Sequence, residues 1–350
     1  MSPETAAHWR AMPPSRLLDC GMTHPDIRAL TAATEGGTSW DAACEQLGEV
    51  HLHLAGAALE LGHPVTAEHE YRSAAADFLF AQMAFNFDTE RKVELYDRFT
   101  SCVDRVASVS RLPMQRIELP FGGGQLVGWM VEPTCPTIGT VVVFGGQSGW
   151  GAAYLRNADS LAQRGIATVL AEGPGQGESR QRFGVHLDVD VSAAYSEFVS
   201  YALARHDAPV GLWGNSMGGL YAALTAAADP RVQACCVNGG FAAPRLLEFR
   251  TFAEQAGAML GTDDPARIEA NFARLRFHPD THHLTAPLLV LHGGADPLVD
   301  LADQQPFLDA AGDATLREWS DGDHTIYNHG DERNDVVADW FADRFRRSAG

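Results

Sequence analysis

One serine in the chain has neighbours of the kind that make a hydroxyl reactive. Residues 210–219 read Val-Gly-Leu-Trp-Gly-Asn-Ser-Met-Gly-Gly, which places Ser216 at the centre of a G-x-S-x-G sequence. The flanking glycines remove side chains that would clash where a strand turns sharply into a helix. Such a turn lifts the hydroxyl out of the sheet, at the positive end of the helix that follows. The spacing predicts that Ser216 is a nucleophile; the alternative is an inert serine in a glycine-rich turn.

Asp296 and His324 are the residues that we expect to activate this serine. Asp296 lies just past an apolar segment typical of a buried strand, and His324 follows the last strand expected in the chain. A carboxylate at such a position can orient a histidine and stabilise the imidazolium that forms when the histidine takes the serine proton. Two rivals remain: Asp300, whose position suits the cap of the next helix, and His329, which lies further from the strand end.

Attack on a carbonyl creates an oxyanion, which needs backbone N–H donors. Met217 directly follows the nucleophile and is expected to supply one donor. The loop 145–150, Gly-Gly-Gln-Ser-Gly-Trp, follows an expected strand, and we predict that the Gln147 N–H is the second donor, with its side-chain amide adding another. The alternative for these glycines is an ordinary strand-to-helix turn. The G-x-G-x-x-G spacing of a dinucleotide-binding loop is absent.

Two further residues are candidates for substrate contacts. Trp150 ends the loop described above, and Glu172 begins the segment Glu-Gly-Pro-Gly-Gln-Gly-Glu-Ser at 172–179. The glycines of this segment permit tight chain reversal, so we interpret it as a structural turn beside the site. Glu172 could alternatively capture a polar group of the substrate.

The elements that position these residues fall into two regions. In region 1–110, residues 1 to about 37 are expected to be loop-rich with one short helix near 26–33, and long helical patterns follow at about 40–62, 65–86 and 90–109. Apolar residues of the first long helix, such as Val50 and Leu54, recur at three- and four-residue steps. Region 111–350 alternates strands with helices, which predicts an α/β fold with a mainly parallel sheet covered on both faces. The strands are expected at 116–120, 125–133, 140–145, 166–171, 210–214, 232–238, 287–292 and 314–319.

The stretch 241–285 separates two of these strands by more than one crossover helix needs. It contains helical patterns near 246–257 and 267–275. We expect a helical cap insert after the sixth strand, which together with the N-terminal helices could roof the edge of the sheet where open α/β sheets place ligands.

The bulk composition narrows the classes of partner. The net charge of −19 disfavours nucleic acid and anionic membrane surfaces as partners. No apolar run approaches the ~20 residues of a membrane span, no secretory signal is visible, and the six cysteines form no C-x-x-C pair, so the cytoplasm is the expected setting. Neither His282-His283 nor the acidic residues around His324 have a recognisable metal-site spacing, so we expect no metal and no cofactor. A small-molecule substrate is expected, and a homodimer is the commonest assembly for such a chain.

Several segments together resemble one branch of the α/β-hydrolases, which includes 2,6-dihydroxypseudooxynicotine hydrolase and fungal pigment hydrolases that shorten polyketide chains. The matching segments are Gly145-Gly146, the 173–178 turn, Gly239-Gly240-Phe241 and Asp321-Gly322-Asp323-His324, and the order Ser, Asp, His is that of the fold. The resemblance implies an eight-stranded α/β-hydrolase core behind an N-terminal helical region. It also implies a triad of Ser216, Asp296 and His324 that cleaves carbon–carbon bonds next to ketones.

The resemblance implies one more functional residue, and the sequence differs from the branch at one position. An acidic residue after the Gly-Gly-Phe segment contributes in the nicotine-pathway enzyme, and Glu248 is the nearest candidate here; the alternative is a solvated or ion-paired helix glutamate. Gln147 stands where relatives have an apolar residue.

The candidate residues and the resemblance are compatible with three functions. The leading one is hydrolysis of a ketone, ester or lactone in specialised metabolism or aromatic catabolism, by cleavage of a C–C or C–O bond. The second is non-hydrolytic elimination by the same serine and histidine, for example loss of acetate from a polyketide-like natural product. The third is a non-catalytic binder, which predicts loss of a triad residue, whereas all three are present.

Overall fold

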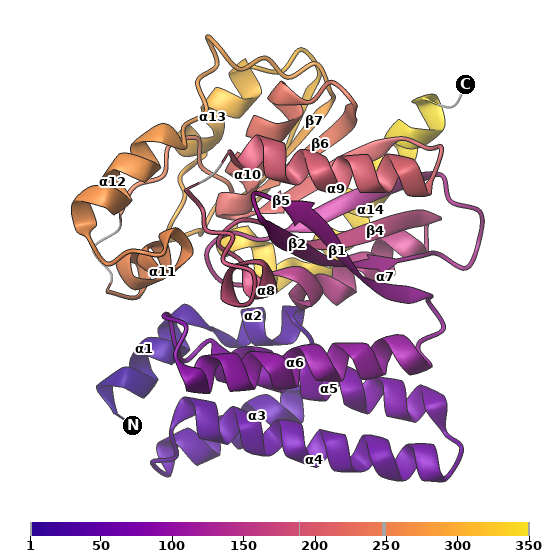
Figure 1. Ribbon diagram of the computed structural model, residues 1–350, viewed down its shortest axis with the longest axis vertical. Coiled ribbons are helices and arrows are strands. Elements are labelled where there is room, and N and C mark those ends of the chain that lie inside the picture. Colours follow the sequence, from indigo (N-terminus) through magenta and orange to yellow (C-terminus); the bar gives the residue numbers. More distant parts are fainter. Residues whose placement is uncertain (1, 189, 247–249, 349–350) are drawn as a thin grey trace. The chain divides into compact units, whose positions relative to one another are not determined.

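The computed structural model describes residues 2–188, 190–246 and 250–348. The chain divides into two compact units, Met1–Met114 and Gln115–Gly350. Figure 1 shows the helices of the first unit and the sheet of the second.

The N-terminal unit is entirely helical. Its helices are α1 (Pro3–Ala11), α2 (Pro14–Asp19), α3 (His24–Glu35), α4 (Trp40–Glu60), α5 (Pro64–Gln82) and α6 (Glu90–Val109). The expected loop-rich start is wrong, because α1 and α2 lie there. Both helices begin with proline in the first turn, where its missing N–H costs nothing, and both are too short to display an apolar period.

A small residue of α4 lets a large side chain of α5 pack close to the α4 backbone. A Cβ on Gly48 would lie 2.7 Å from the Phe78 ring, so only glycine lets the ring pack against α4. Val50 and Leu54, which the apolar spacing singled out, are 56% and 44% exposed, whereas Ala55 is buried. The spacing therefore identified the helix correctly but not the face that it buries.

The second unit is built on an eight-stranded sheet with the order β1-β2-β4-β3-β5-β6-β7-β8. The strands are β1 (Met114–Phe121), β2 (Gly124–Val131), β3 (Gly139–Phe144), β4 (Ile166–Glu172), β5 (Val210–Asn215), β6 (Val232–Asn238), β7 (Leu288–Gly293) and β8 (Ala314–Trp319). Strands β3 to β8 pair in parallel, and β2 pairs antiparallel with β4. The predicted eight-stranded, mostly parallel α/β-hydrolase sheet is confirmed.

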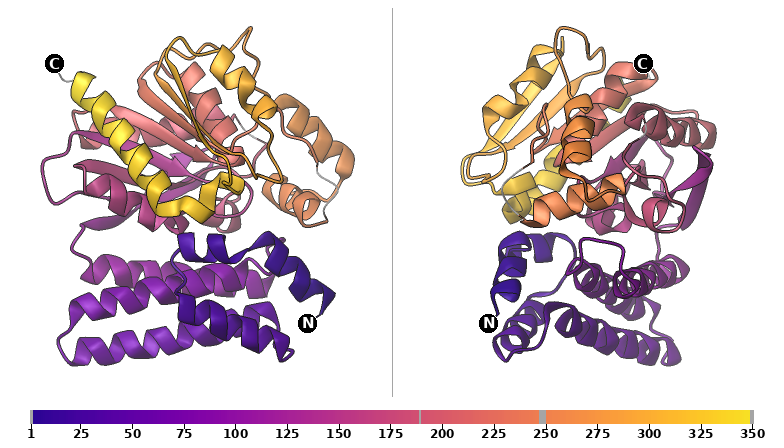
Figure 2. Two further views of the ribbon diagram at one scale, coloured as in Figure 1. Left: turned by 180° about the vertical axis from the view of Figure 1, so that it is seen from behind. Right: turned by 60° about the vertical axis from the view of Figure 1, so that its left-hand side comes forward.

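Helices cover both faces of this sheet (Figures 1 and 2). The helices α9 and α10 lie on the face seen in Figure 1, and α14 lies on the face seen from behind in Figure 2. The helices of this unit are α7 (Leu155–Ala162), α8 (Gly177–Gln181), α9 (Val191–Arg205), α10 (Met217–Ala228), α11 (Arg250–Leu260), α12 (Pro265–Arg274), α13 (Leu301–Asp309) and α14 (Gly330–Ser348). Central strands such as β3 are buried along their whole length, which agrees with their mainly apolar sequences.

The insert between β6 and β7 contains α11 and α12, as expected. It packs against the turn that follows β4: the Leu187 N–H donates to the Met259 carbonyl at 2.8 Å, and a Cβ on Gly175 would lie 2.9 Å from that of Met259. Glu248, the acidic candidate in this insert, lies outside the described residues.

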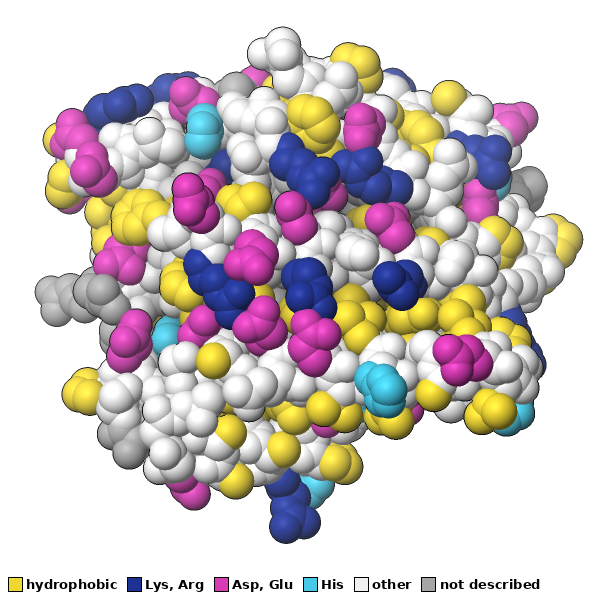
Figure 3. All heavy atoms as spheres, turned by 60° about the horizontal axis from the view of Figure 1, so that its bottom comes forward, with side chains coloured by type: hydrophobic (Ala, Val, Ile, Leu, Met, Phe, Trp, Pro, Cys, Tyr) yellow, Lys and Arg dark blue, Asp and Glu magenta, His cyan; other side chains and the backbone are white. Residues whose placement is uncertain are grey.

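The surface of the described residues mixes charge and apolar side chains. Figure 3 shows acidic, basic and apolar side chains interspersed on one face. None of the described helices combines the length and the apolar character that a membrane span requires.

Candidate active site

Ser216 lies in the turn between β5 and α10, and its backbone is strained. Its φ of 57° and ψ of −131° are unusual for a residue with a side chain. A Cβ on Gly214 would lie 2.0 Å from the Gly218 carbonyl oxygen, so this turn cannot form with any larger residue there. The G-x-S-x-G spacing thus reflects the space available in the turn.

The structure brings Ser216, His324 and Asp296 into hydrogen-bonding contact. His324 Nε2 lies 2.8 Å from Ser216 Oγ, and His324 Nδ1 lies 2.8 Å from Asp296 Oδ2. The second carboxylate oxygen of Asp296 accepts from the backbone N–H groups of Leu298 and Val299 at 2.8 and 3.2 Å. The Asp296 side chain is 1% exposed and that of His324 18%, so the carboxylate is fixed while the imidazole stays reachable.

The two rival residues lie elsewhere. Asp300 is the N-cap residue of α13, and its N–H donates to the Asp303 carboxylate at 3.1 Å. His329 Nε2 lies 3.0 Å from Asp321 Oδ1. Neither rival contacts Ser216 among the described residues, so the geometry favours Asp296 and His324.

The loop after β3 lies against the start of α10, where the second oxyanion donor was expected. A Cβ on Gly146 would lie 2.7 Å from the Met217 nitrogen and 3.2 Å from Ser216 Cβ. The Met217 N–H belongs to the first turn of α10, where N–H groups have no acceptor within the helix. Gln147 follows directly; it is 7% exposed, and its Nε2 has no hydrogen-bond partner among the described residues. The loop thus brings the candidate donors Met217 and Gln147 into the neighbourhood of Ser216.

Gln176, which the sequence did not single out, holds this loop in place. Its side chain is fully buried, and its Nε2 donates to the carbonyls of Gly145 and Gly146 at 2.7 and 3.1 Å. Its Oε1 accepts from the Gly173 N–H at 3.0 Å and from the Tyr195 hydroxyl at 3.2 Å. With both carbonyls bound on the Gln176 side, the loop backbone is fixed.

Trp150 and Glu172 belong to the same buried framework. The Trp150 indole N–H donates to the Gly146 carbonyl at 3.1 Å, and the Arg180 guanidinium lies 5.3 Å from the centre of its ring. Glu172 is 0% exposed and accepts from the Glu178 N–H at 2.7 Å. These contacts let both residues support the two turns, and substrate contact by Trp150 or Glu172 stays a prediction.

A second buried chain of amides joins the nucleophile turn to the histidine loop. Asn215 Nδ2 donates to the Phe144 carbonyl at 3.3 Å, and its Oδ1 accepts from Asn238 Nδ2 at 2.8 Å. Asn238 Nδ2 also donates to the carbonyl of Thr325 at 3.0 Å, and the buried Arg333 donates to the same oxygen at 3.0 Å. The residues next to Ser216 and next to His324 are therefore tied together.

Comparisons with known proteins agree with this architecture. Residues 136–263 match the family model described as serine aminopeptidase, S33. The sheet and its helices have the α/β-hydrolase fold, and the similarity to this family extends over the matched segment.

Within that class, the chain resembles the branch that its motifs indicated. The 2,6-dihydropseudooxynicotine hydrolase of Paenarthrobacter nicotinovorans is 29% identical over 297 residues, which cover 81% of this chain and 78% of that protein. The crystal structure of the 2,6-dihydroxy-pseudo-oxynicotine hydrolase matches with a TM-score of 0.84 at 26% identity, over 95% of both chains. An alpha/beta hydrolase of Penicillium citrinum is 30% identical over 215 residues, 56% of this chain and 50% of that protein.

Proposed function

We propose that the chain is a serine hydrolase that cleaves an acyl bond of a small-molecule ketone, ester or lactone through Ser216, His324 and Asp296. The observation that carries the proposal is the unbroken series of hydrogen-bonding contacts from Asp296 through the imidazole to Ser216 Oγ, with both contacts at 2.8 Å. This is the arrangement in which a histidine removes a proton from serine while a carboxylate stabilises the resulting imidazolium.

The steps follow from that arrangement. Ser216 Oγ attacks the substrate carbonyl as His324 Nε2 takes its proton, and the oxyanion is stabilised by the N–H groups of Met217 and Gln147. Collapse breaks the bond to the leaving group, which receives the proton from His324 and departs as a ketone, arene or alcohol. Water, deprotonated by His324, then attacks the acyl-serine and releases a carboxylic acid and free Ser216.

The carbon–carbon bond next to a ketone is the preferred target within this class. The long match to a named 2,6-dihydropseudooxynicotine hydrolase supports this choice, because it extends over 81% of the chain and includes more than the core motifs. An ester or lactone would use the same attacking groups, since only the leaving group differs.

The test combines a serine-directed probe with labelled water. Wild type should be labelled at Ser216 by a fluorophosphonate and should turn over at least one member of a panel of β-diketones, aryl esters and acetylated enols. Ser216→Ala should lose both properties, and in H₂¹⁸O the acid product should carry the heavy oxygen. Activity that survives Ser216→Ala would overturn the nucleophile. Unlabelled acetate from an acetylated enol would instead indicate elimination.

A further inference from the structure

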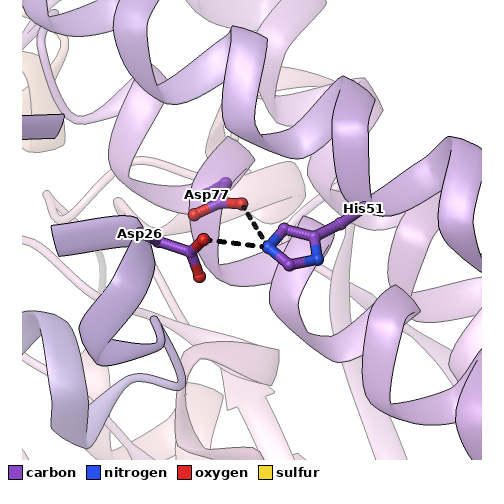
Figure 4. Close-up of side chains that lie close together, drawn as sticks. All are labelled: Asp26, His51 and Asp77. Carbon is purple, nitrogen blue, oxygen red and sulfur yellow. Dashed lines mark hydrogen bonds and ion pairs between the residues drawn. The ribbon is translucent and has the colours of Figure 1, made fainter. Parts of the chain in front are cut away.

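Three helices of the N-terminal unit bring polar side chains to one buried point (Figure 4). Asp26 comes from α3, His51 from α4 and Asp77 from α5. His51 Nε2 lies 3.1 Å from Asp26 Oδ1 and 3.8 Å from Asp77 Oδ2. Among the described residues, this is the only group of three or more His, Cys, Asp or Glu whose potential ligand atoms all lie within 4.8 Å of one another.

Asp77 is the unusual member of this group. Its side chain is 0% exposed, and neither carboxylate oxygen has a hydrogen-bond partner among the described residues. Among the described residues, the His51 imidazole is the group that can carry the opposite charge beside it. His51 Nε2 lies 3.8 Å from Asp77 Oδ2, which is too far for a hydrogen bond. A buried carboxylate without partners is unfavourable, and buried carboxylates are normally paired or bound to a metal.

The other two members are already oriented toward the same point. Asp26 Oδ2 accepts from the Thr23 N–H at 3.1 Å and from the Thr23 hydroxyl, which leaves Oδ1 directed at His51. On the far side of the ring, His51 Nδ1 lies 2.6 Å from Glu70 Oε2. The Glu70 contact orients the ring, and in the neutral tautomer with the proton on Nδ1 the lone pair of Nε2 is available to a metal, as in many metal-binding histidines.

The cluster contains more negative than positive charge. Three carboxylates surround one imidazole, so full ionisation of the acids leaves an excess even when His51 is protonated. A bound cation would compensate this excess.

We propose that Asp26, His51 and Asp77 bind a divalent cation of the zinc class, with Glu70 orienting the histidine. One imidazole nitrogen and two carboxylate oxygens suit zinc and its neighbours, whereas magnesium and calcium prefer oxygen ligands alone. Tetrahedral zinc with bonds of about 2.0–2.2 Å separates its ligand atoms by about 3.3–3.6 Å. The observed separations of 3.1 and 3.8 Å lie on either side of this range, so small side-chain movements would complete the site.

The proposed role of the ion is structural. It links α3, α4 and α5, whose ligands are far apart along the chain, and a water molecule would complete the tetrahedron. Binding to the folded state alone stabilises a protein by mass action. The site belongs to the N-terminal unit. Its test does not depend on whether the proposed catalytic function is correct.

The test uses full-length protein stripped of metal with a chelator and titrated with Zn²⁺. We expect a single high-affinity zinc ion per chain by mass spectrometry of the metal content. At a zinc concentration about 100-fold above the dissociation constant, the melting temperature should rise by roughly 5–10 °C. Cobalt(II) in the same site should show d–d absorption bands without a thiolate charge-transfer band. Such a band would mean capture by a cysteine, for instance the exposed Cys135, and would overturn the assignment.

Asp77→Asn is the informative variant because it keeps the shape and removes the charge. It should fold, since it relieves a buried unpaired carboxylate, and it should lose the bound zinc and the zinc-dependent rise in melting temperature. His51→Gln should behave in the same way. His206→Gln is the matched control: His206 Nε2 lies 2.8 Å from Glu132 Oε2 in a pair without a third ligand, so zinc binding should be unchanged. Absence of zinc from the wild type, or equal zinc binding by Asp77→Asn, would overturn the proposal.

Discussion

Asn238 Nδ2 donates to the carbonyl of Thr325 at 3.0 Å, which links the end of β6 to the residue directly after His324. The same amide group donates to Asn215 Oδ1, next to Ser216. One buried side chain thus bridges the segments that carry the proposed nucleophile and the proposed base. Its position predicts that the spacing between Ser216 and His324 depends on an amide that touches neither.

Replacement of Asn238 tests this positioning role. Asn238→Ala should lower kcat by about 10–100-fold with little change in KM, because a small displacement of the imidazole impairs proton transfer more than substrate binding. Steady-state kinetics on the best substrate of the panel measures this. Asn271→Ala, which removes an exposed amide of α12, is the control and should leave both constants unchanged. If KM rose by as large a factor as kcat fell, the variant would have lost structure generally, and the positioning role would be contradicted.

Asp296 and Asp300, the two candidates for the triad carboxylate, give a matched pair of variants. Asp296→Asn should reduce kcat by roughly 10³–10⁴-fold, because the amide cannot stabilise the imidazolium of His324. Asp300→Asn should retain activity, since Asp300 only caps α13 and asparagine is also a good N-cap residue. Comparable losses in both variants would contradict the assignment of Asp296.

Gln176 is expected to matter for both stability and rate. Gln176→Leu removes the Gln176 donor from the buried carbonyls of Gly145 and Gly146, and the Gly146 carbonyl keeps its hydrogen bond from the Trp150 indole. An orphaned buried carbonyl costs about 1–3 kcal/mol. Movement of this loop would also displace the Gln147 N–H, so kcat should fall by about 10²–10³-fold if that group stabilises the oxyanion. Chemical denaturation and kinetics measure the two effects. Gln305→Leu, an exposed glutamine on α13, should change neither.

The oxyanion loop itself gives a sharper steric prediction. A methyl group at Gly146 would lie 2.7 Å from the backbone nitrogen of Met217, and backbone cannot move aside as a flexible side chain can. Gly146→Ala should therefore lower kcat by at least about 10-fold through displacement of the loop. Gly56→Ala on α4, where an added Cβ meets no atom within 4 Å, is the control. Wild-type kinetics in Gly146→Ala would show that the loop does not contribute to the reaction.

The sequence revealed those features that depend on local spacing. The strands, the turn at Ser216 and the places of Asp296 and His324 all follow from residues that are neighbours in the chain or lie at strand ends. Gln176, Asn238 and Arg333 could not be recognised, because the importance of a buried amide or guanidinium depends on which distant carbonyl it meets. The cluster of Asp26, His51 and Asp77 escaped for the same reason, since its members come from three separate helices. Helices α1 and α2 were missed because both are too short to display an apolar period.

Among the described residues, the non-glycine residues with left-handed backbone are Ser216, Thr325 and Ile326. Each costs of order 1–3 kcal/mol, and the two β-branched residues lie directly after His324. The fold therefore concentrates its local instability where it presents its reactive groups. A library of variants selected for heat resistance alone should accumulate glycine or asparagine at position 325, and its survivors should be the poorer enzymes. Selection for turnover should restore the strained residue.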